Sequence, residues 1–494
     1  MQLRERIVNL ALLTDRLAEQ NPTASAISGD AVEYSRAGLR DAVALAASRL
    51  QEAGVSAGDV VAVMLPNTAS FVVAMFAAWR LGAAVTPINP TMTGAEVGYQ
   101  IADAGAGVLI SEAVPDYEVS SPVVLTPADL AAGAVTVGGA TEVPDDALAL
   151  LIYTSGTTGR PKGVMLDHAN LAAMCSVLVD NFELTERDRS LLILPLFHVN
   201  GIVIGTLSPL LAGGSAVIAG RFSPKSFFDR LEDARPTYFS AVPAIYTMLA
   251  DLPTDVAPDT SSVRFGICGA APASVELLEK FQGRYGIPLI EGYGLSEGTC
   301  VSFANPLHGI RKQGSVGLPL AGQSVRIVDA GGAEVPAGES GEVLIKGANV
   351  MRGYLNRPEE TERTVVDGWL HTGDVGRLDD DGYLYLVDRA KDMIIRGGEN
   401  IYPKEIEAVV YQLPEIAEAA VVGRPHQVLG EEPVLFVSLN SGAELSPDAI
   451  AEHLRAVLSK FKHPAQITIL DDLPKNPVGK IHKPRLRERV AENR

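Results

Sequence analysis

The first part of the chain alternates short apolar runs with helix-length segments, and this alternation limits the fold more than any other feature. Apolar runs of about four to eight residues are typical of strands that are buried on both faces of a sheet. Parallel strands need crossovers of helical length, and the spacers provide them. We therefore expect an α/β fold, arranged as two sheets within residues 1 to about 320. The runs are VVAVMLP, GVLIS, LALLIYT, SLLILPL, SAVIAG, TYFSAVP, VRFGICG and PLIEGYG.

Two later regions differ in texture from the first part. From about Gly314 to Val387, Gly, Asp and Pro separate short β-type runs, which predicts a small antiparallel β unit. Beyond it, PKEIEAVVYQLPEIAEAAVVG predicts a helix followed by a strand, and SPDAIAEHLRAVLSKF predicts another helix with Ser446 as its N-cap. Because the chain has 494 residues and one core accommodates roughly 250 to 300, we expect several domains.

The composition excludes some partners. Hydrophobic residues make up 47% of the chain and charged residues 20%, which is typical of a globular protein. The formal net charge of −19 would repel a phosphate backbone, so we expect no nucleic-acid partner. Cys175, Cys268 and Cys300 lie far apart without metal-ligand spacing, so neither a disulfide framework nor a zinc site is indicated. A reducing, cytoplasmic location is therefore expected.

One stretch is long enough to be compared with a membrane span. Between Ser190 and Gly220 there is no Asp, Glu, Lys or Arg, whereas a bilayer is crossed by ~20 residues. Prolines, glycines and His198 interrupt the stretch, so we expect a buried strand, loop, helix and strand. The N-terminus MQLRERIVNLALLTDRLAEQ predicts an amphipathic helix and lacks the apolar core of a signal peptide. No integral membrane association is expected.

The segment YTSGTTGRPKG, from Tyr153 to Gly163, concentrates hydroxyl groups, glycines and two cations directly after an apolar run. That run predicts a strand that delivers a loop. Glycine lets backbone N–H groups crowd around an anion, and the Ser and Thr side chains add donors, so phosphate is the expected guest. The nucleotide loop G-x-x-x-x-G-K-[ST] does not match, because counting from Gly156 places Pro161 at its second glycine. Taken alone, the segment has a flexible polar linker as its alternative.

Five other stretches carry residues suited to ATP chemistry on a carboxylate. EGYGLSEGT offers an aromatic ring, a hydroxyl and a carboxylate, and GWLHTGD ends in a carboxylate after an expected tight turn. DRAKDMIIRGGENIYPKEIE combines cations with paired glycines, LPLFHVNG places a histidine among apolar residues, and PKNPVGKIHK carries a lysine on an expected loop. Taken singly, each has an ordinary alternative. These alternatives are Tyr293 in the core, Glu297 at a helix start, Asp374 as a turn former, Arg389 and Lys391 as a solvated pair, His198 as a core histidine and Lys480 as a surface lysine.

The motifs and their order resemble the adenylate-forming superfamily of acyl-CoA synthetases, aryl-CoA ligases, peptide-synthetase adenylation domains and luciferases. The resemblance covers essentially the whole chain and is carried by YTSGTTGRPKG, LPLFHVNG, GYGLSEGT, HTGD, DRAKD with GGENIYPKEIE, and NPVGKI. It implies a large N-terminal domain of stacked α/β sheets plus a small β unit, hinged to a smaller C-terminal α+β lid domain. We expect the N-terminal domain over residues 1–390, with α/β subdomains over about 1–320 and a β-rich subdomain over about 314–387. The lid is expected over residues 391–494.

The resemblance also implies how ATP is bound. The segment from Thr154 to Lys162 would wrap the β- and γ-phosphates, GAAP and Tyr293 would flank adenine, and Asp374 and Arg389 would bind ribose. The implied ATP and AMP ligands are Thr154, Ser155, Gly156, Thr157, Thr158, Gly159, Lys162, Gly269, Ala270, Ala271, Pro272, Tyr293, Gly294, Asp374 and Arg389.

The chemistry explains why such residues are needed. A carboxylate that attacks the α-phosphorus brings two anions together, which requires cations and oriented donors. By resemblance, Ser296 would meet the α-phosphate, Glu297 would hold Mg²⁺, and Lys480 would be the lysine of adenylation. The family more often has Thr where Ser296 stands, and this difference keeps the hydroxyl.

A second step needs a thiol where Lys480 had been, so one lid pose cannot serve both reactions. The resemblance implies that Lys391 is the hinge and that Gly397 and Gly398 line the pantetheine tunnel once the lid has rotated. The family more often has Gly at the position of Asp388, so this chain carries an extra charge beside the hinge.

We expect the acid to be fatty or aryl. His198, Asn200 and Gly292 would shape the acyl pocket. Dicarboxylate ligases of this family tend to have an arginine just before the Tyr-Gly pair, and here that residue is Gly292, which argues against a malonate-like acid. Small residues that would leave room for a bulky chain or ring are Gly266, Gly269 and Ala270.

The expected enzyme is an AMP-forming acyl-CoA synthetase, an acid–thiol ligase that makes an acyl-AMP with release of pyrophosphate and then an acyl-CoA. It would use ATP, Mg²⁺, coenzyme A and a small-molecule carboxylic acid. Acyl transfer to a carrier protein, or a reaction that stops at the adenylate, stays open, although nothing after Lys480 resembles a carrier domain. A luciferase-like oxidase is a further alternative. A homodimer is also left open by the sequence.

Overall fold

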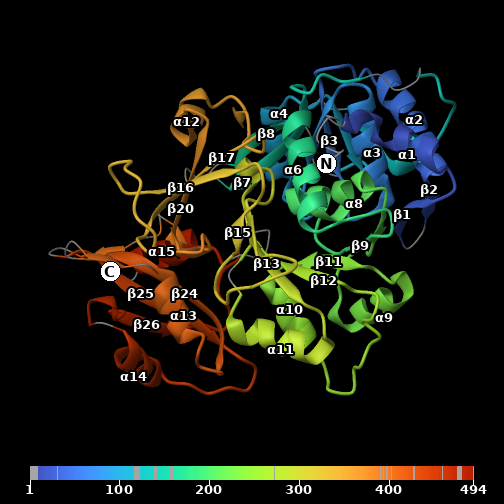
Figure 1. Cartoon of the computed structure of the whole chain (residues 1–494). Helices are drawn as coiled ribbons and strands as arrows, with labels where there is room; N and C mark the ends of the chain where they lie inside the picture. Colours follow the sequence, from blue (N-terminus) through green and yellow to red (C-terminus); the bar gives the residue numbers. More distant parts are fainter. Residues whose placement is uncertain are drawn as a thin grey trace. The chain divides into compact units, whose positions relative to one another are not determined.

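The structure is a computed structural model, and it divides into two compact units. The first unit comprises Met1–Val325 and Ile345–His371, and the second comprises Arg326–Leu344 and Thr372–Arg494. Figure 1 labels many of the elements of both units. The described residues are 9–29, 32–115, 123–137, 142–155, 161–271, 273–389, 392, 394–396, 399–401, 403–426, 429–458, 460–475 and 481–492.

The larger sheet of the first unit, sheet A, has a parallel centre and antiparallel edges. Among the described residues its strands stand in the order β15-β14-β13-β12-β11-β9-β10-β1-β2. The strands from β13 to β1 in this order pair in parallel, and β2, β14 and β15 pair antiparallel. Their bounds are β1 (Ser25–Gly29), β2 (Glu33–Ser35), β9 (Arg189–Leu192), β10 (Ser215–Ile218), β11 (Tyr238–Ala241), β12 (Phe265–Cys268), β13 (Leu289–Tyr293), β14 (Phe303–Ala304) and β15 (Leu318–Pro319).

The second sheet of this unit, sheet B, has the order β18-β8-β7-β4-β3-β5-β6 in the described part of the chain. The strands β7, β4, β3, β5 and β6 run parallel, whereas β8 and β18 pair antiparallel at one edge. The predicted pair of parallel-centred sheets is confirmed, but β18 comes from beyond residue 320. The bounds are β3 (Val60–Met64), β4 (Ala84–Pro87), β5 (Val108–Ser111), β6 (Val123–Leu125), β7 (Leu148–Ser155), β8 (Pro161–Asp167) and β18 (Gly353–Tyr354).

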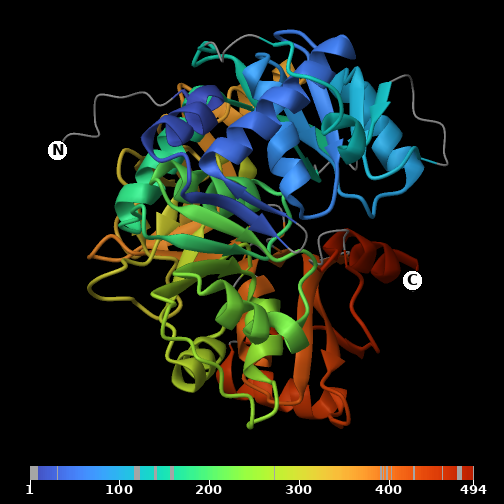
Figure 2. The same ribbon diagram turned by 90° about the vertical axis from the view of Figure 1, so that its right-hand side faces the viewer.

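Helices cover both sheets of the first unit, and Figure 2 shows them from the side. The predicted N-terminal helix is present from Leu10 onward, and residues 1–8 lie outside the described part. The helical bounds are η1 (Leu10–Leu12), α1 (Leu13–Gln20), α2 (Arg36–Glu52), α3 (Ala69–Arg80), α4 (Gly94–Ala104), α5 (Pro127–Leu130), α6 (His168–Asn181), α7 (Val199–Ile202), η2 (Val203–Leu207), α8 (Ser208–Leu211), α9 (Pro224–Ala234), α10 (Pro243–Ala250), α11 (Val275–Tyr285), η3 (Ser296–Gly298) and α12 (Pro358–Thr364).

Helix α3 explains how the two sheets stay together. It is apolar around its whole circumference, and every residue except Ser70 is buried. Such a helix is stable only where it is covered on all sides. It contacts β3 and β4 of sheet B and also β1 of sheet A, so it lies between the sheets. Its Trp79 Nε1 donates a hydrogen bond to the Ala149 carbonyl at 2.9 Å, which satisfies the polar end of a fully buried ring.

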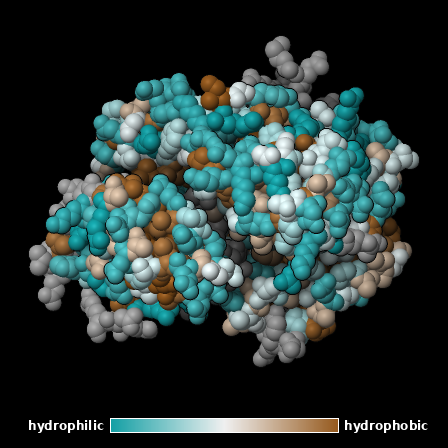
Figure 3. All heavy atoms as spheres, turned by 90° about the horizontal axis from the view of Figure 1, so that it is seen from below, coloured by the Kyte–Doolittle hydropathy of each residue, from teal (hydrophilic) through white to brown (hydrophobic). Residues whose placement is uncertain are grey.

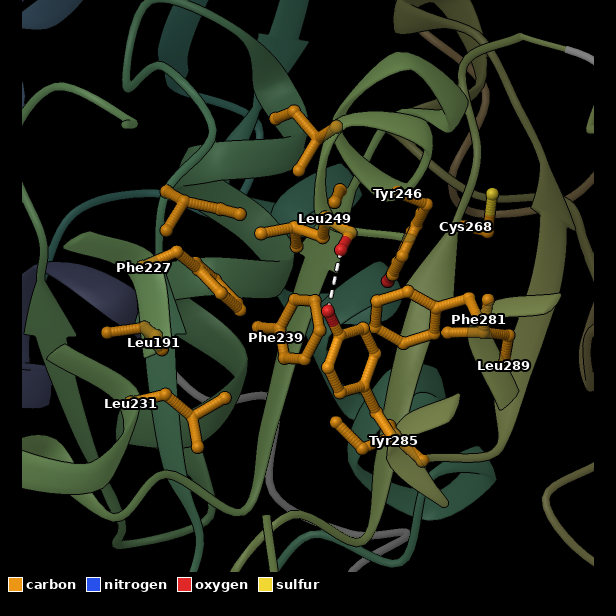
Figure 4. Packing of buried hydrophobic residues seen from close by; sticks show 14 of the residues in the cluster. Leu191, Phe227, Leu231, Phe239, Tyr246, Leu249, Cys268, Phe281, Tyr285 and Leu289 are labelled. Atoms are coloured by element: carbon orange, nitrogen blue, oxygen red, sulfur yellow. Dashed lines mark hydrogen bonds between the residues drawn. The ribbon is translucent and has the colours of Figure 1, made fainter. Parts of the chain in front are cut away.

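The other face of sheet A carries a large aromatic core under α9, α10 and α11. Figure 4 shows Phe227, Tyr246 and Phe281 from these three helices packed over the strands. The Tyr285 hydroxyl donates to the Leu249 carbonyl at 2.6 Å, drawn as the dashed line, so this buried polar group is satisfied. This core keeps the strands of sheet A rigid, and the candidate site lies at the ends of these strands.

The uncharged stretch from Ser190 to Gly220 forms β9, a helical segment and β10, as predicted. Its middle is the π-helical turn η2, which joins α7 to α8. Buried hydroxyls satisfy the widened turn, because Thr206 Oγ1 donates to the Gly201 carbonyl and Ser208 Oγ donates to the Val203 carbonyl. No helix in the described ranges is long and apolar enough to cross a membrane.

A smaller sheet has the order β16-β17-β20-β19, with β21 beside β20. The boundary between the two units falls within β16, β17 and β20. Strands β19, β20 and β21 pair antiparallel, as expected for this region, and the predicted bounds of a β-rich subdomain over about 314–387 stay a prediction. The bounds are β16 (Ser324–Val328), β17 (Gly341–Lys346), β19 (Val365–Val366), β20 (Trp369–Leu378) and β21 (Leu384–Arg389).

The C-terminal sheet of the second unit is buried on both faces, and β25 shows why. Leu435 and Val437 point into the core under α13 and α14, whereas Val434 and Phe436 pack under α15, as the alternation of a strand requires. Ser446 caps α14 by accepting from the Ala449 N–H, which confirms its prediction. The order is β23-β22-β25-β24 with β26 beside β25. The bounds are β22 (Ile394–Arg396), β23 (Glu399–Ile401), α13 (Pro403–Val410), β24 (Ile416–His426), β25 (Gly430–Leu439), α14 (Pro447–Val457), η5 (Lys460–Lys462), β26 (Gln466–Ile469) and α15 (Lys483–Glu492).

The surface is largely hydrophilic on the face that Figure 3 shows. On the face in Figure 3, hydrophilic residues cover most of the area and hydrophobic residues form small separate groups. Scattered apolar residues of this kind are ordinary on a globular protein.

Candidate active site

The phosphate-type segment forms the end of a β-hairpin. Strand β7 is buried in sheet B and ends at Ser155, and β8 returns from Pro161. Thr154 lies opposite Lys162 in the register, so the chain is held by strand pairing on both sides of residues 156–160. This confirms the strand that was expected before the segment. Residues 156–160 lie outside the described part of the chain.

Lys162 lies in a charged environment that the sequence did not indicate. Its Nζ is 2.8 Å from Glu360 Oε2 of α12 and 5.1 Å from the centre of the Tyr354 ring. Strand β18 brings these partners to the hairpin, because Tyr354 pairs with Val164 of β8. The Lys162 side chain is 13% exposed, so both contacts are partly shielded from water.

Tyr354 also connects the hairpin with the predicted metal carboxylate. Its hydroxyl donates to Glu297 Oε1 at 2.9 Å. Burial, together with the nearby Glu297 carboxylate, raises the pKa of Tyr354 above its ordinary value, so the hydroxyl keeps its proton. Lys162 and Glu297, which lie far apart in the sequence, therefore share one partner.

The turn after β13 fixes Glu297 through the backbone. Ser296 and Glu297 belong to the 3₁₀ turn η3, and the Met351 N–H donates to the Glu297 carbonyl at 2.9 Å. A Cβ at Gly294 would overlap the Cys300 carbonyl oxygen. Thr299 adopts a left-handed backbone with φ of 53°, a conformation that non-glycine residues rarely adopt. The turn is therefore tight enough to set the direction of both functional side chains.

The predicted adenine side lies at the carboxyl ends of β12 and β13. A Cβ at Gly269 would lie 3.1 Å from the Gly292 carbonyl oxygen, so these two backbones approach closely. Ala270 is exposed and has a φ of 66°, a strained conformation for alanine. Ala271 is exposed as well, and Tyr293 is buried at 9% exposure beside Phe303. Ligands of open α/β sheets bind at such strand ends.

Glu291 lies on β13, and the pKa of its carboxyl group is raised. Burial raises its pKa from 4.5 to about 7. Its register partner on β12 is Cys268, which belongs to the aromatic core. A carboxyl at the edge of an apolar core loses hydration, and this loss disfavours its charged form.

Two of the predicted acyl residues, His198 and Asn200, lie at the start of α7, whereas Gly292 is on β13. His198 precedes the helix as its N-terminal flanking residue and is only partly buried, with its ring 4.7 Å from that of Phe197. Asn200 Oδ1 is buried and has no hydrogen-bond partner among the described residues. An unpartnered buried amide oxygen of this kind can accept from a donor on a ligand.

Gly266 does not leave room for a substrate, contrary to the sequence expectation. A Cβ there would lie 2.8 Å from Leu289 Cδ2 and 2.8 Å from the Tyr246 hydroxyl oxygen. The space is already filled by the aromatic core. The residue at position 266 has to be small because it packs against Tyr246, whose hydroxyl donates to the Ile267 carbonyl.

The second unit carries the predicted ribose ligands. Asp374 is 6% exposed and lies opposite Arg389 in the register of β20 and β21. A tight turn does precede Asp374, at Asp367 and Gly368, where the chain passes from β19 into β20. HTGD itself is part of the ten-residue strand β20, and Gly373 has a φ of 67° within it.

Several predicted site residues have no described geometry and stay predictions. For Ser155 and Arg389 only the backbone is described. The predicted residues outside the described part are Gly156, Thr157, Thr158, Gly159, Pro272, Lys391, Gly397, Gly398 and Lys480.

The donor set fits one magnesium ion that is shared with a substrate. Within the described ranges no group of three or more His, Cys, Asp or Glu residues is arranged to hold a metal. Mg²⁺ in nucleotide enzymes is commonly held by one or two carboxylates plus phosphate oxygens and waters. Glu297 supplies one oriented carboxylate, so the residues present fit this mode.

Family models match the chain over most of its length. Residues 14–355 match the AMP-binding enzyme model, and residues 405–480 match that of the AMP-binding enzyme C-terminal domain. The chain belongs to the AMP-binding enzyme family.

Relatives of this AMP-binding enzyme are CoA ligases. A feruloyl-CoA synthase from Amycolatopsis sp is 37% identical over 489 residues, covering 96% of this chain and 98% of that protein. The oxalate–CoA ligase of Arabidopsis thaliana is 36% identical, covering 96% of this chain and 97% of that protein. The o-succinylbenzoate CoA synthetase of Bacillus subtilis, solved with its acyl-adenylate, has a TM-score of 0.88 and 32% identity and covers 97% of both chains.

These findings confirm the predicted reaction class. The AMP-binding enzyme is an ATP-dependent carboxylate–CoA ligase that works through an acyl-adenylate, and it uses ATP with Mg²⁺ and coenzyme A. The fold class that the resemblance implied is confirmed as well.

Sequence reasoning missed three residues that contact or adjoin the predicted site residues, namely Tyr354, Glu360 and Glu291. Tyr354 had a weak signal, since it follows Gly353, whose φ of 139° only glycine adopts easily. Glu360 had none, because PEET is an ordinary start of an exposed helix.

Proposed function

We propose that the enzyme activates an aryl or fatty monocarboxylate, and that Gly292 is the observation that carries this choice. At this position a Cβ would lie 3.2 Å from the Phe303 carbonyl oxygen. A side chain at this position would therefore require Phe303 to shift slightly, and glycine offers no charge to a second carboxylate. The stretch from Ser190 to Gly220, which contains the predicted acyl residues His198 and Asn200, has no Asp, Glu, Lys or Arg and supports an apolar acid. The feruloyl-CoA synthase supports the aryl class, whereas the oxalate–CoA ligase shows that overall similarity does not decide the acid.

In the proposed first step, the acid carboxylate attacks the α-phosphorus of ATP and pyrophosphate leaves. Bound Mg²⁺ supplies positive charge to the phosphates. Glu297 holds that charge in place and is itself oriented by the Tyr354 hydroxyl. Lys162 faces the β- and γ-phosphates from the hairpin, and Ser296 presents a hydroxyl to the α-phosphate. No general base is needed, because the acid is already ionised near neutral pH.

Adenine and ribose are proposed to lie against backbone and acidic groups. Gly269, Ala270, Ala271 and Tyr293 would flank the base, as their position at the strand ends supports. Asp374, with Arg389 opposite to it, would bind the ribose hydroxyls, since a buried carboxylate accepts hydrogen bonds well.

We further propose that residues 391–494 form a lid that rotates about Lys391 between the two steps. The separate family match over residues 405–480 supports a distinct C-terminal module. In one pose Lys480 would bridge the acid and the α-phosphate, and in the other Gly397 and Gly398 would line the path of the pantetheine. The acyl-adenylate hydrolyses readily, so the lid also has to exclude water.

The acid is tested by mass spectrometry of the enzyme with Mg-ATP and a panel of octanoate, laurate, cinnamate, ferulate, malonate and oxalate, with and without CoA. Acyl-CoA that forms only with CoA, from the aryl or fatty members, is expected. Preference for malonate or oxalate in kcat/KM would exclude the proposed acid class. Adenylate that accumulates and ignores CoA would point to a carrier protein as the acceptor.

The role of Lys480 is tested by Lys480→Ala. Loss of a contact to the transition state should reduce acyl-adenylate formation on the order of 10²- to 10³-fold. Acyl transfer from a supplied acyl-adenylate to CoA should continue at the parent rate. Adenylation at the parent rate in the variant would show that Lys480 is not the lysine of this step.

We also propose a cytoplasmic location and leave the homodimer as a proposal for sedimentation measurements. Three buried thiols support a reducing compartment. Burial raises the pKa of Cys175 to about 12, so this thiol stays protonated and unreactive.

A further inference from the structure

Glu360 already satisfies the charge of the phosphate-facing lysine. The ion pair joins Lys162 Nζ and Glu360 Oε2 at 2.8 Å, and the two side chains are 13% and 27% exposed. A phosphate that uses Lys162 therefore has to share the ammonium group with a carboxylate or displace it. Since the carboxylate and the phosphate carry charge of the same sign, Glu360 opposes the binding of phosphate at this position.

The ion pair is not needed to hold α12 in place. Strand pairing of Tyr354 with Val164 and the hydrogen bond from the Leu355 N–H to the Gly163 carbonyl seat the segment before the helix. Arg357 Nη2 lies 3.2 Å from Asp103 Oδ1. With these contacts in place, removal of the Glu360 charge should leave the helix where it is.

A hydrogen bond between the Tyr354 backbone and Thr361 gives further support to the position of α12. The Tyr354 N–H donates to Thr361 Oγ1 at 2.9 Å, and Thr361 Oγ1 donates to the Arg357 carbonyl at 2.9 Å. The start of α12, which includes Glu360, is therefore held by hydrogen bonds that do not involve Lys162. The Glu360 carboxylate points toward Lys162.

We propose that Glu360 is a built-in counter-ion of Lys162 that limits the affinity of the hairpin for the β- and γ-phosphates and so allows pyrophosphate to leave. The inference rests on the proposed function, because it takes Lys162 as a phosphate ligand. Glu360 is a positioning residue, since it acts through Lys162 and not on the reacting atoms.

The chain offers a matched control at the neighbouring residue. Glu359 is also in the first turn of α12, but its side chain is 85% exposed and pairs with Arg363 at 3.5 Å. Glu359→Gln removes the same charge from the same helix without touching Lys162. Glu360→Asp keeps the charge and serves as the conservative variant.

Isothermal titration with Mg-ATP, and separately with Mg-pyrophosphate, tests the proposal on the full chain. Glu360→Gln should lower both dissociation constants about two- to tenfold, the range of one partly exposed charge contact. KM for ATP should fall while kcat stays the same or falls, because tighter pyrophosphate leaves more slowly. Glu359→Gln and Glu360→Asp should stay within about twofold of the parent.

A double-mutant cycle separates a local effect from a general one. In a Lys162→Met background, Glu360→Gln should no longer change the dissociation constant for Mg-pyrophosphate. A change of the parent size in that background would overturn the role through Lys162. Melting temperatures of all variants within a few degrees of the parent exclude unfolding as the cause.

The outcomes also separate this inference from the proposed function. If the parent binds Mg-ATP and Glu360→Gln binds it equally or more weakly, the counter-ion role is wrong and the proposed function stands. If the parent binds neither Mg-ATP nor Mg-pyrophosphate, the proposed function fails and this inference fails with it.

Discussion

The hairpin β7–β8 and the turn after β13 both follow a buried strand, yet the two are held in different ways. Around the hairpin, side chains make the connections: Tyr153 donates to Asp103 at 2.8 Å, and Lys162 pairs with Glu360. In the turn, side chains such as Thr299 and Asn349 also form hydrogen bonds, but the path of the backbone depends on the close fit of Gly294 against the Cys300 carbonyl. Single side-chain contacts can be lost one at a time, whereas a backbone fit is kept or lost as a whole. We therefore expect graded effects in the hairpin and abrupt ones in the turn.

The largest effect is expected from Gly294→Ala. The added Cβ would overlap the Cys300 carbonyl, so the turn has to open, and we expect a loss of more than about 3 kcal/mol in the free energy of unfolding. Urea unfolding and adenylate formation measure the two consequences. Gly283→Ala in α11 is the control, because a Cβ there meets nothing within 4 Å and should be neutral or stabilising. Parent-like stability of Gly294→Ala would break the comparison.

Next in size is Glu297→Gln, which removes the charge that the turn presents. We expect a fall in kcat for adenylation on the order of 10²- to 10³-fold with little change in stability, since the amide keeps the shape. Titration of Mg²⁺ in the presence of ATP should require higher concentrations for the variant. An unchanged Mg²⁺ dependence would show that the metal is held elsewhere.

Glu291, on the strand β13 that precedes the turn, should make the stability of the protein depend on pH. Glu291→Gln should remove this dependence. The carboxyl has a pKa of about 7 in the folded chain and an ordinary value of 4.5. Between these values only the folded state holds the proton, so stability falls as pH rises from about 4.5 to about 7. The measurement compares the free energies of unfolding of parent and variant at pH 5 and at pH 8. Between these pH values the parent should lose about 2 to 3 kcal/mol more than the variant. Parallel curves would contradict the raised pKa.

The smallest effect is expected from Tyr354→Phe, at the residue that contacts both Lys162 of the hairpin and Glu297. The ring still packs beside Lys162, and only the hydrogen bond to Glu297 is lost. We expect KM for Mg-ATP to rise about three- to tenfold, as for one hydrogen bond to a charged group. The stability should change by less than about 1 kcal/mol. A loss as large as that of Glu297→Gln would mean that the hairpin is not held by independent contacts.

Much of the fold could be predicted because the apolar runs and the strands coincide. SAVIAG and VRFGICG, for example, became β10 and β12 within the parallel centre of sheet A. The motif order gave the family, because long ordered motifs rarely arise by chance. The sequence also indicated a tight turn before Asp374, and it lies at Asp367 and Gly368, whereas the extent of β20 through HTGD was not predicted.

Contacts between distant segments could not be predicted. Glu360 reaches Lys162 only because β18 adds to β8, and a two-residue strand leaves no periodic signal in the sequence. Gly266 was misread for a related reason, because a small residue can mark either a pocket or a tightly filled core. Only the position of Tyr246 decides between them.

The placement of α3 has a consequence for the order in which the protein can be made. Its apolar surface is covered on one side by β1, but β1 itself pairs with β10, whose residues are 215–218. During translation, α3 leaves the ribosome long before residues 215–218, so its apolar surface stays exposed until β10 has been synthesised. Segments in this condition are prone to aggregate and are bound by chaperones. During synthesis, the first 200 or so residues should therefore behave as a chaperone client, and the first unit should become protease-resistant only once β10 has emerged.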